Sequence, residues 1–304
     1  MDFFSEKSHK FRTGHNRTNL VMRFDTKISF LIGFLTPISF YCYLNNRITS
    51  DHADTYLSHT SANRLSAYYQ CYKQPRAVDE VLKSFRRFYP FSEVIMVNDG
   101  GDPALIQDIA AHYNAKFWYS PQRTSDRNDS MFFSSYLAAH TYIARIIDAS
   151  ANCDWLLLLE DDVWILGHIP FHQFRHVLNG GHPAMILDSV LVKTFAPPNT
   201  TETGLQSWQY AGNGGTVLRC SFYRDLNLHP RWNTTVSALI DAKPTIASDE
   251  LLSSVTYAAG GTIGAFEAYA EPSFVTFFYR LLAGDIAVLH QAKYLYDAHS
   301  VADQ

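Results

Sequence analysis

The sequence predicts an α/β fold in which a mostly parallel sheet is covered by helices on both faces. Strand-like and helix-like segments alternate three times between residues 64 and 164, which is typical of such a sheet. Two strand candidates, "EVIMV" (93–97) and "WLLLL" (155–159), are almost purely apolar, as expected of buried strands. The composition agrees, because 47% hydrophobic and only 18% charged residues indicate a folded chain with a sizeable core.

Local signals bound each of these elements. A strand over 65–72 precedes a helix that begins at Pro75, a favoured first helical residue, and ends at Pro90. The apolar residues of this helix fall on one face: Val78, Val81, Leu82, Phe85 and Phe88. After the 93–97 strand, "NDGGDP" predicts a sharp turn. We then expect a helix at 103–114 with Leu105, Ile109 and Tyr113 inward, a strand at 116–120, a polar loop, a helix at 131–149 and a strand at 154–159.

The alternation loosens after residue 165. Strands are expected at 183–192 and 214–223, and a helix at 248–261 that a pair of glycines ends. The sequence shows no internal repeat and no low-complexity tract. We therefore expect one domain over residues 64–304, made of two halves, 64–175 and 176–304.

The N-terminus contains a candidate membrane anchor. Residues 1–27 hold six Lys or Arg against three acids, and residues 28–44 contain no charge. That length is the short limit for a membrane span, and the basic flank places residues 1–27 in the cytosol. We expect a single-pass type II protein of the Golgi or endoplasmic reticulum membrane, with a stem at 45–63 and a lumenal body. A buried helix and a cleaved signal peptide are the alternatives.

Charge and cysteine content narrow the partners. A net charge of -4, without a basic block in the folded part, gives no support for nucleic acid as the partner. Glycosylation acceptors at Asn128, Asn199 and Asn233 agree with a lumenal body. The cysteines lack metal-ligand spacing, so either one disulfide or buried free thiols are expected among Cys71, Cys153 and Cys220.

Two of the predicted strands end in acids. Asp99 follows the 93–97 strand, and Glu160, Asp161 and Asp162 follow the 154–159 strand. Ligands of open α/β sheets bind beyond the carboxyl ends of the strands. Adjacent carboxylates repel one another, so three together favour a bound cation or solvent. Carboxylates combined with substrate phosphates commonly hold Mg²⁺ or Mn²⁺. The alternative is a solvated loop that caps the strand.

Five segments, in their order along the chain, resemble the GT-A glycosyltransferases. These segments are "VIMVNDGGDP", "LLLLEDDVWIL", "YAGNGGTVLR", "ASDELL" and "VLHQAKYLY". Enzymes of that fold use nucleotide-sugar donors and commonly carry an acidic D-x-D or E-D-D motif. The resemblance covers about residues 64–295 and looks closest to glycosyltransferases of large algal viruses, algae and other protists. It implies a GT-A-like domain with a nucleotide-binding half at 64–175 and an acceptor half at 176–304.

The resemblance assigns roles to the acids at the strand ends. Asp162 would contact the metal, whereas Glu160 and Asp161 would meet the ribose or base, or bind the metal through water. Asp99, with Asn98 beside it, would contact the nucleoside, although Asn-Asp-Gly-Gly also forms a tight turn unaided. The triplet here is Glu-Asp-Asp instead of Asp-x-Asp, and "NDGG" replaces the commoner D-D-G-S. The identity of the nucleotide is therefore open.

Residues nearer the C-terminus complete the implied site. His290 would be a further ligand of Mn²⁺ or Mg²⁺, and Lys293 would offset charge on the diphosphate; a surface His and a solvated Lys are the alternative. Asp249 would be the base that deprotonates the acceptor hydroxyl, with Glu250 as second candidate. The competing interpretation is an ordinary helix start, with Ser248 or Asp249 as the N-cap.

Three further residues would line the substrates. Gly214 and Gly215 would let the backbone approach the donor sugar and the acceptor, where a plain glycine turn is the alternative. Trp208 would stack on a sugar face or belong to the core. The resemblance thus implies a metal-dependent, inverting glycosyltransferase that moves a hexosyl or pentosyl group from a nucleotide sugar to a glycan or glycoconjugate hydroxyl. The rivals are a membrane-tethered glycan-binding protein without catalysis and a sugar nucleotidyltransferase.

Overall fold

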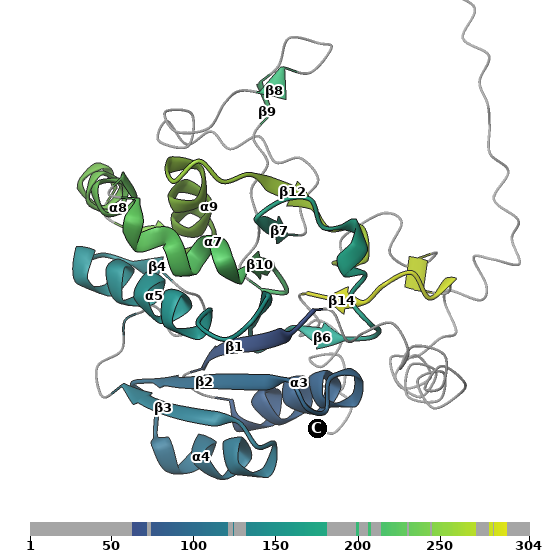
Figure 1. Ribbon diagram of the computed structural model, residues 1–304. Helices are drawn as coiled ribbons and strands as arrows, with labels where there is room; N and C mark the ends of the chain where they lie inside the picture. The colour runs from purple at the N-terminus through teal and green to yellow at the C-terminus, as the bar shows by residue number, and fades with distance from the viewer. Residues whose placement is uncertain are drawn as a thin grey trace, which may run out of the picture. The chain divides into compact units, whose positions relative to one another are not determined.

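The main sheet has seven strands in the spatial order β12-β7-β10-β5-β1-β2-β3 (Figure 1). The computed structural model describes residues 63–71, 74–120, 124, 132–180, 199–200, 206–207, 214–229, 231–243, 245–271, 280–281 and 283–290. In chain order, the strands of the main sheet are β1 (Leu65–Cys71), β2 (Glu93–Asp99), β3 (Lys116–Ser120), β5 (Trp155–Leu159), β7 (Leu178–Gly180), β10 (Val217–Arg219) and β12 (Ile263–Ala265).

The four strands predicted in the first half form one parallel block. β1 lies between β5 and β2, and β2 pairs with β3, all in parallel register. β10 is antiparallel to β5 and to β7, and β12 is parallel to β7. The prediction of a mostly parallel sheet is confirmed. Because β1, β2 and β5 run in the same direction, their carboxyl ends meet at one edge of the sheet.

Short strands form three smaller sheets. In the first, β6 (Trp164–Ile165) is antiparallel to β14 (Val288–Leu289), which is parallel to β13 (Tyr269–Ala270). The other two are pairs, β4 (Phe132–Phe133) with β11 (Ile246–Ala247) and β8 (Asn199–Thr200) with β9 (Gln206–Ser207). The β13-β14-β6 sheet brings distant parts of the chain to the end of β5.

Helices cover both faces of the main sheet, as predicted. One face carries α5 (Tyr136–Ala149), α7 (Cys220–Arg224), α8 (Arg231–Ala242) and α9 (Ser248–Ala258), and the other carries α3 (Pro75–Phe88) and α4 (Pro103–His112) (Figure 1). Short 3-10 helices lie at Phe171–Gln173 (η2) and Asp225–Leu228 (η3). On the first face, Tyr142 and Ile146 of α5 belong to the same buried cluster as Leu156 and Leu158 of β5.

The sequence predicted the buried face of α3 but not that of α4. α3 buries Val78, Val81, Leu82 and Phe85, as its pattern indicates, whereas Phe88 at its end is only half-buried. α4 instead buries Ile106 and Ala110, and Leu105 is 54% exposed. The prediction for α4 was wrong by about one position. Its face is ambiguous because apolar and small residues occur all round the helix, so contact with β2 and β3 decides its rotation.

Several predicted boundaries are also wrong. α5 starts at Tyr136, not at residue 131, because Ser135 caps it by accepting from the Ala138 N–H at 3.2 Å. Of the predicted strand at 214–223, only Val217–Arg219 is a strand, and Cys220 begins α7. A short apolar run fits a strand or a buried helix equally well. At α9 the N-cap is Ala247, without a side-chain cap, so neither Ser248 nor Asp249 has the expected capping role.

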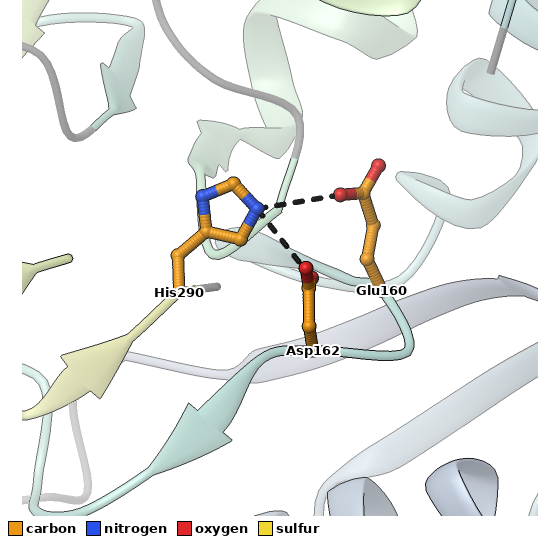
Figure 2. Close-up of side chains that lie close together, drawn as sticks. All are labelled: Glu160, Asp162 and His290. Atoms are coloured by element: carbon orange, nitrogen blue, oxygen red, sulfur yellow. Dashed lines mark ion pairs between the residues drawn. The ribbon is translucent and has the colours of Figure 1, made fainter. Parts of the chain in front are cut away.

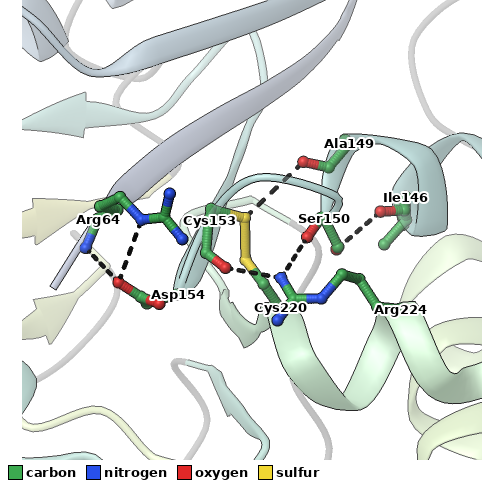
Figure 3. The surroundings of a disulfide bond; sticks show 8 residues. All are labelled: Arg64, Ile146, Ala149, Ser150, Cys153, Asp154, Cys220 and Arg224. Carbon is green, nitrogen blue, oxygen red and sulfur yellow. Dashed lines mark hydrogen bonds and ion pairs between the residues drawn. A yellow bond between two sulfur atoms is a disulfide. The ribbon is translucent and has the colours of Figure 1, made fainter.

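A disulfide joins Cys153, just before β5, to Cys220 at the start of α7 (Figure 3). Arg224 of the same helix donates to the carbonyl oxygens of Ser150 and Cys153, both at 2.8 Å. These contacts fasten α7 to the loop that leads into β5. Cys71 is buried as a free thiol. Of the outcomes left open by the sequence, the structure therefore has one disulfide and one buried thiol.

We expect this disulfide to be a large part of the stability of the domain. It closes a segment with a sequence separation of 67 residues, for which the chain-entropy estimate is about 4 kcal/mol. Urea unfolding with and without reductant measures this contribution. Reductant should lower the midpoint of the wild-type protein and leave a Cys153→Ala/Cys220→Ala variant unchanged. An unchanged wild-type midpoint would contradict the prediction.

Some predicted features lie outside the described residues. They are the tail at 1–27, the anchor at 28–44, the stem at 45–63 except its last residue, the strand at 183–192, Trp208 and Lys293. Within the described part of the chain, no helix combines the length and apolar character that crossing a membrane requires.

Candidate active site

The small β13-β14-β6 sheet assembles a cluster of ionisable groups at the end of β5. Glu160, Asp161 and Asp162 follow β5 directly, and β6 begins two residues after Asp162. β14 pairs antiparallel with β6 so that Leu289 faces Trp164, which places His290 beside the acidic turn. On the other side of β14, Ala270 faces Leu289, which places Glu271 next to His290. Three segments far apart in sequence thus meet at one point.

Glu160, Asp162 and His290 have the arrangement of a metal site. One potential ligand atom from each residue lies within 4.8 Å of the others. His290 Nε2 is 3.5 Å from Glu160 Oε2 and 3.5 Å from Asp162 Oδ1 (Figure 2). The His290 and Asp162 side chains are only 12% and 10% exposed, whereas Glu160 is 25% exposed. Two carboxylates and an imidazole suit Mn²⁺.

Electrostatics also favour a cation at this point. Burial lowers the pKa of His290, but hydrogen bonds to Glu160 and Glu271, together with the charges of Glu160 and Asp162, raise it to about 10. The metal-free protein therefore holds a proton on His290, and that positive charge offsets the surrounding carboxylates. The side chains of Glu160, Asp162 and His290 fit a divalent cation, whose charge would offset the carboxylates in place of that proton.

Gly214 packs directly against this cluster. A Cβ at Gly214 would lie 2.6 Å from His290 Nε2 and 2.8 Å from Glu160 Oε2. The next residue, Gly215, has a φ of +79°, which favours glycine, and its N–H donates to the Leu158 carbonyl of β5 at 2.8 Å. The glycine turn is thus attached to the strand that carries the acids. A side chain at position 214 would occupy space between the metal-binding atoms.

We expect Gly214→Ala to weaken Mn²⁺ binding by roughly 10-fold or more, because the added methyl group would displace His290 or Glu160 from its place in the candidate metal site. Isothermal titration calorimetry with Mn²⁺ measures this loss. Gly167→Ala is the matched control, since a Cβ there meets atoms only at 3.6 Å or beyond, an ordinary contact. Equal Mn²⁺ affinity in both variants would show that Gly214 does not border the metal.

The middle acid of the triplet points to a different partner. Asp161 Oδ1 accepts from the hydroxyl of Tyr69 at 2.6 Å, and Tyr69 is fully buried in β1. Burial, followed by the charge of Asp161, raises the pKa of Tyr69 well above its usual value, so the phenol stays protonated and donates. This bond fastens the acidic turn to the neighbouring strand. Glu160 and Asp162, on either side, face His290.

Asp99 ends β2 within a dense polar network. Its Oδ2 accepts from the Thr124 hydroxyl at 2.7 Å, the Thr124 N–H at 2.9 Å and the Gln70 amide at 3.0 Å. Its Oδ1 pairs with Arg145 of α5 at 3.0 Å. Neighbouring Asn98 accepts from the Gly101 N–H at 2.9 Å and donates to the Asp102 carbonyl at 3.0 Å. The Asn98 amide therefore shapes the turn, while Asp99 holds three segments together.

The two candidate bases at the start of α9 have different surroundings. Glu250 Oε1 pairs with Lys243 Nζ at 2.6 Å. Asp249 accepts from the Ser248 hydroxyl at 3.3 Å. After burial, the charges of Glu160 and Asp249 both contribute to raising the pKa of Tyr142 and that of Tyr269. Glu250 is thus neutralised by a lysine, whereas Asp249 accepts from a neutral hydroxyl.

Several residues of this site escaped the sequence analysis. Tyr269 and Glu271 contact His290, and Arg145, Gln70 and Thr124 surround Asp99. Glu271 lies in "EAYAEPS", where nothing distinguishes it from an ordinary surface acid. Arg145 is a polar residue in an otherwise apolar stretch of α5, which was a usable but weak signal.

Two solved structures of similar fold belong to the same enzyme. The galactosyltransferase LgtC, in complex with donor and acceptor sugar analogs, has a TM-score of 0.52 and 13% identity, over 78% of this chain and 95% of that chain. An active-site mutant of LgtC has a TM-score of 0.50 and 12% identity, over 78% and 95%. No family model and no curated protein matches. The chain therefore has the fold of a GT-A glycosyltransferase.

Proposed function

We propose that this protein is a metal-dependent glycosyltransferase that moves a hexosyl or pentosyl group from a nucleotide sugar to a glycan or glycoconjugate hydroxyl. The observation that carries the proposal is the cluster of Glu160, Asp162 and His290 at the carboxyl end of β5, with the Gly214 backbone against it. In an α/β sheet this edge is the ligand side. A cluster of two acids and a histidine suits the diphosphate of a nucleotide once a cation is bound.

The residues around the cluster have separate roles in this proposal. A bound Mn²⁺ or Mg²⁺ would supply Lewis-acid stabilisation of the departing nucleotide. Asp162, His290 and Glu160 would hold the metal, and Glu160, the most exposed of the three, would also border the donor. Lys293, close after His290 in sequence, adds positive charge for the diphosphate. Gly215 would border the sugar and the acceptor, and Trp208, which lies outside the described residues, is assigned to them from the resemblance alone.

Asp249 is the proposed general base. Removal of the proton from the acceptor hydroxyl lets its oxygen attack the anomeric carbon while the bond to the nucleotide diphosphate breaks. A direct displacement of this kind inverts the anomeric configuration. The proposal favours Asp249 over Glu250 because the Glu250 carboxylate is neutralised by Lys243 at 2.6 Å.

The experiment that tests the proposed function is a donor screen. The full chain is incubated with a panel of nucleotide sugars, and nucleotide release is measured with Mn²⁺, with Mg²⁺ and with a chelator. Release from one donor that depends on the metal would support glycosyl transfer or donor hydrolysis, and acceptor glycans then separate these two. A folded protein that binds glycans but neither metal nor nucleotide would identify the binding-protein alternative instead.

The proposal includes a membrane-anchored, lumenal location in the Golgi or endoplasmic reticulum. It rests on the basic residues 1–27 and the uncharged residues 28–44, which precede the catalytic domain. Expression in cells with a C-terminal tag, followed by protease treatment of sealed microsomes, decides the orientation. A tag that the protease removes without detergent would refute the type II topology.

A further inference from the structure

Glu271, Tyr269 and His290 form a closed triangle of polar contacts next to the candidate metal site. The Tyr269 hydroxyl donates to Glu271 Oε1 at 2.8 Å and lies 2.6 Å from His290 Nδ1. His290 Nδ1 is also 3.1 Å from Glu271 Oε1. All three contacts are on the side of the imidazole ring away from Glu160 and Asp162, which face Nε2. The two nitrogens of His290 therefore have different partners.

This triangle is almost fully enclosed. The Tyr269 residue is 1% exposed, and the Glu271 side chain is 3% exposed. Both are placed by β13, whose parallel pairing with β14 sets Ala270 opposite Leu289 and lets the His290 N–H donate to the Ala270 carbonyl at 3.0 Å. Because the backbone of β13 is paired with that of β14, the His290 ring is held in one arrangement relative to Tyr269 and Glu271.

The hydrogen-bond pattern determines which imidazole nitrogen is protonated. An ionised Glu271 accepts only, so the Tyr269 O–H is directed at it and the tyrosine oxygen is left to accept. His290 Nδ1, within reach of that oxygen and of Glu271, must then carry the proton. If Nδ1 were instead the acceptor, the Tyr269 O–H would have to point at His290 and not at Glu271. The buried Glu271 Oε1 would then face the lone pairs of the tyrosine oxygen and of Nδ1 in place of these two donors, which costs free energy. Nε2, which faces Glu160 and Asp162, is thus the nitrogen that can give up its proton and offer its lone pair to a metal.

We propose that Glu271, assisted by Tyr269, is a positioning residue that fixes His290 in the tautomer whose Nε2 binds the metal. It contacts neither the donor nor the metal, and it acts by accepting from Nδ1–H, which orients the ring and makes Nε2 a better ligand. The inference rests on the metal-binding part of the proposed function. It adds to the site an acid that the E-D-D motif does not contain. This acid follows β13, which is far from that motif in sequence.

The test measures Mn²⁺ affinity in the absence of donor, so that it does not depend on turnover. Free Mn²⁺ is titrated into the full chain and followed by electron paramagnetic resonance. Glu271→Ala should weaken Mn²⁺ binding about 10- to 100-fold. Glu271→Gln, whose amide oxygen can still accept, should lose less than Glu271→Ala, and so should Tyr269→Phe. Nitrogen NMR of the imidazole in the Zn²⁺-loaded wild-type protein should show a protonated Nδ1 and a metal-bound Nε2.

The controls separate positioning from damage to the fold. Tyr223→Phe removes another buried hydroxyl, which lies 2.7 Å from the Thr256 hydroxyl, and it should leave Mn²⁺ affinity unchanged. Thermal unfolding of each variant identifies those that fold. Folded Glu271 variants that bind Mn²⁺ like the wild type, or a protonated Nε2 in the NMR spectrum, would overturn the inference. If the Glu271 variants bound Mn²⁺ normally but Asp162→Asn did not, the inference about Glu271 would fail and the proposed metal-dependent function would stand. A wild-type protein that binds no Mn²⁺ would overturn the inference and the proposed function together.

Discussion

Replacement of Asp162 by Asn should reduce metal-dependent nucleotide release by roughly 100-fold or more. Asn has the same shape as Asp but no charge, so it should bind a divalent cation more weakly. Without the cation, the site lacks the positive charge that would stabilise the departing diphosphate. The same change should leave the melting temperature close to that of the wild type, because it relieves repulsion from Glu160 but also removes the attraction to protonated His290. Nucleotide release assays and thermal unfolding measure the two effects. Loss of activity with retained stability is the expected signature of a metal ligand.

Asp102→Asn is the matched control for that variant. Asp102 caps α4 by accepting from the Ala104 N–H at 2.9 Å, and Asn caps a helix about as well. It is an exposed acid next to the turn after β2, so the same chemical change is made away from His290. Near-normal release is expected. If Asp162→Asn behaved like Asp102→Asn, the acidic triplet would be a solvated cap of β5 and nothing more.

Asp249→Asn should lower kcat about 10²- to 10⁴-fold while leaving Mn²⁺ affinity and the KM for the donor nearly unchanged. The reason is that the lost carboxylate would act on the acceptor proton and not on the metal or the nucleotide. Steady-state kinetics with a saturating acceptor measure the effect. NMR of the product tests the mechanism that goes with it, because a base at this position requires inversion at the anomeric carbon.

Glu250→Gln is the informative companion variant. Gln can still accept from Lys243 Nζ, so the local structure is kept while the charge is removed. We expect a kcat close to that of the wild type. A large loss in Glu250→Gln with little in Asp249→Asn would reverse the assignment of the two residues. Asp241→Asn, on the exposed side of α8, controls for a general loss of negative charge. Retention of configuration in the product would exclude either residue as a base of this kind.

The elements that the sequence located well are those with a strong local pattern. β1, β2, β3 and β5 are found within two residues because runs such as "WLLLL" are apolar and bounded by turn residues. α3 is found because its apolar residues recur at helical spacing between two prolines. α4 and α7 show the limit of this reasoning. Their apolar residues fit more than one face or period, and only the neighbouring β2, β3 and β10 decide between them.

The sequence alone determines the α/β class and the acids at the ends of β2 and β5, since strand burial and strand-end acids are local properties. The candidacy of His290 came from the resemblance to GT-A glycosyltransferases. Tertiary structure decides that Glu160 and Asp162 face His290 while Asp161 bonds to Tyr69, and that Glu271 lies behind the imidazole. Those choices depend on the two-residue strands β6, β13 and β14, which are too short to carry a periodic signal. Their pairing is favourable only once the core has brought distant segments together, so no local pattern can reveal it.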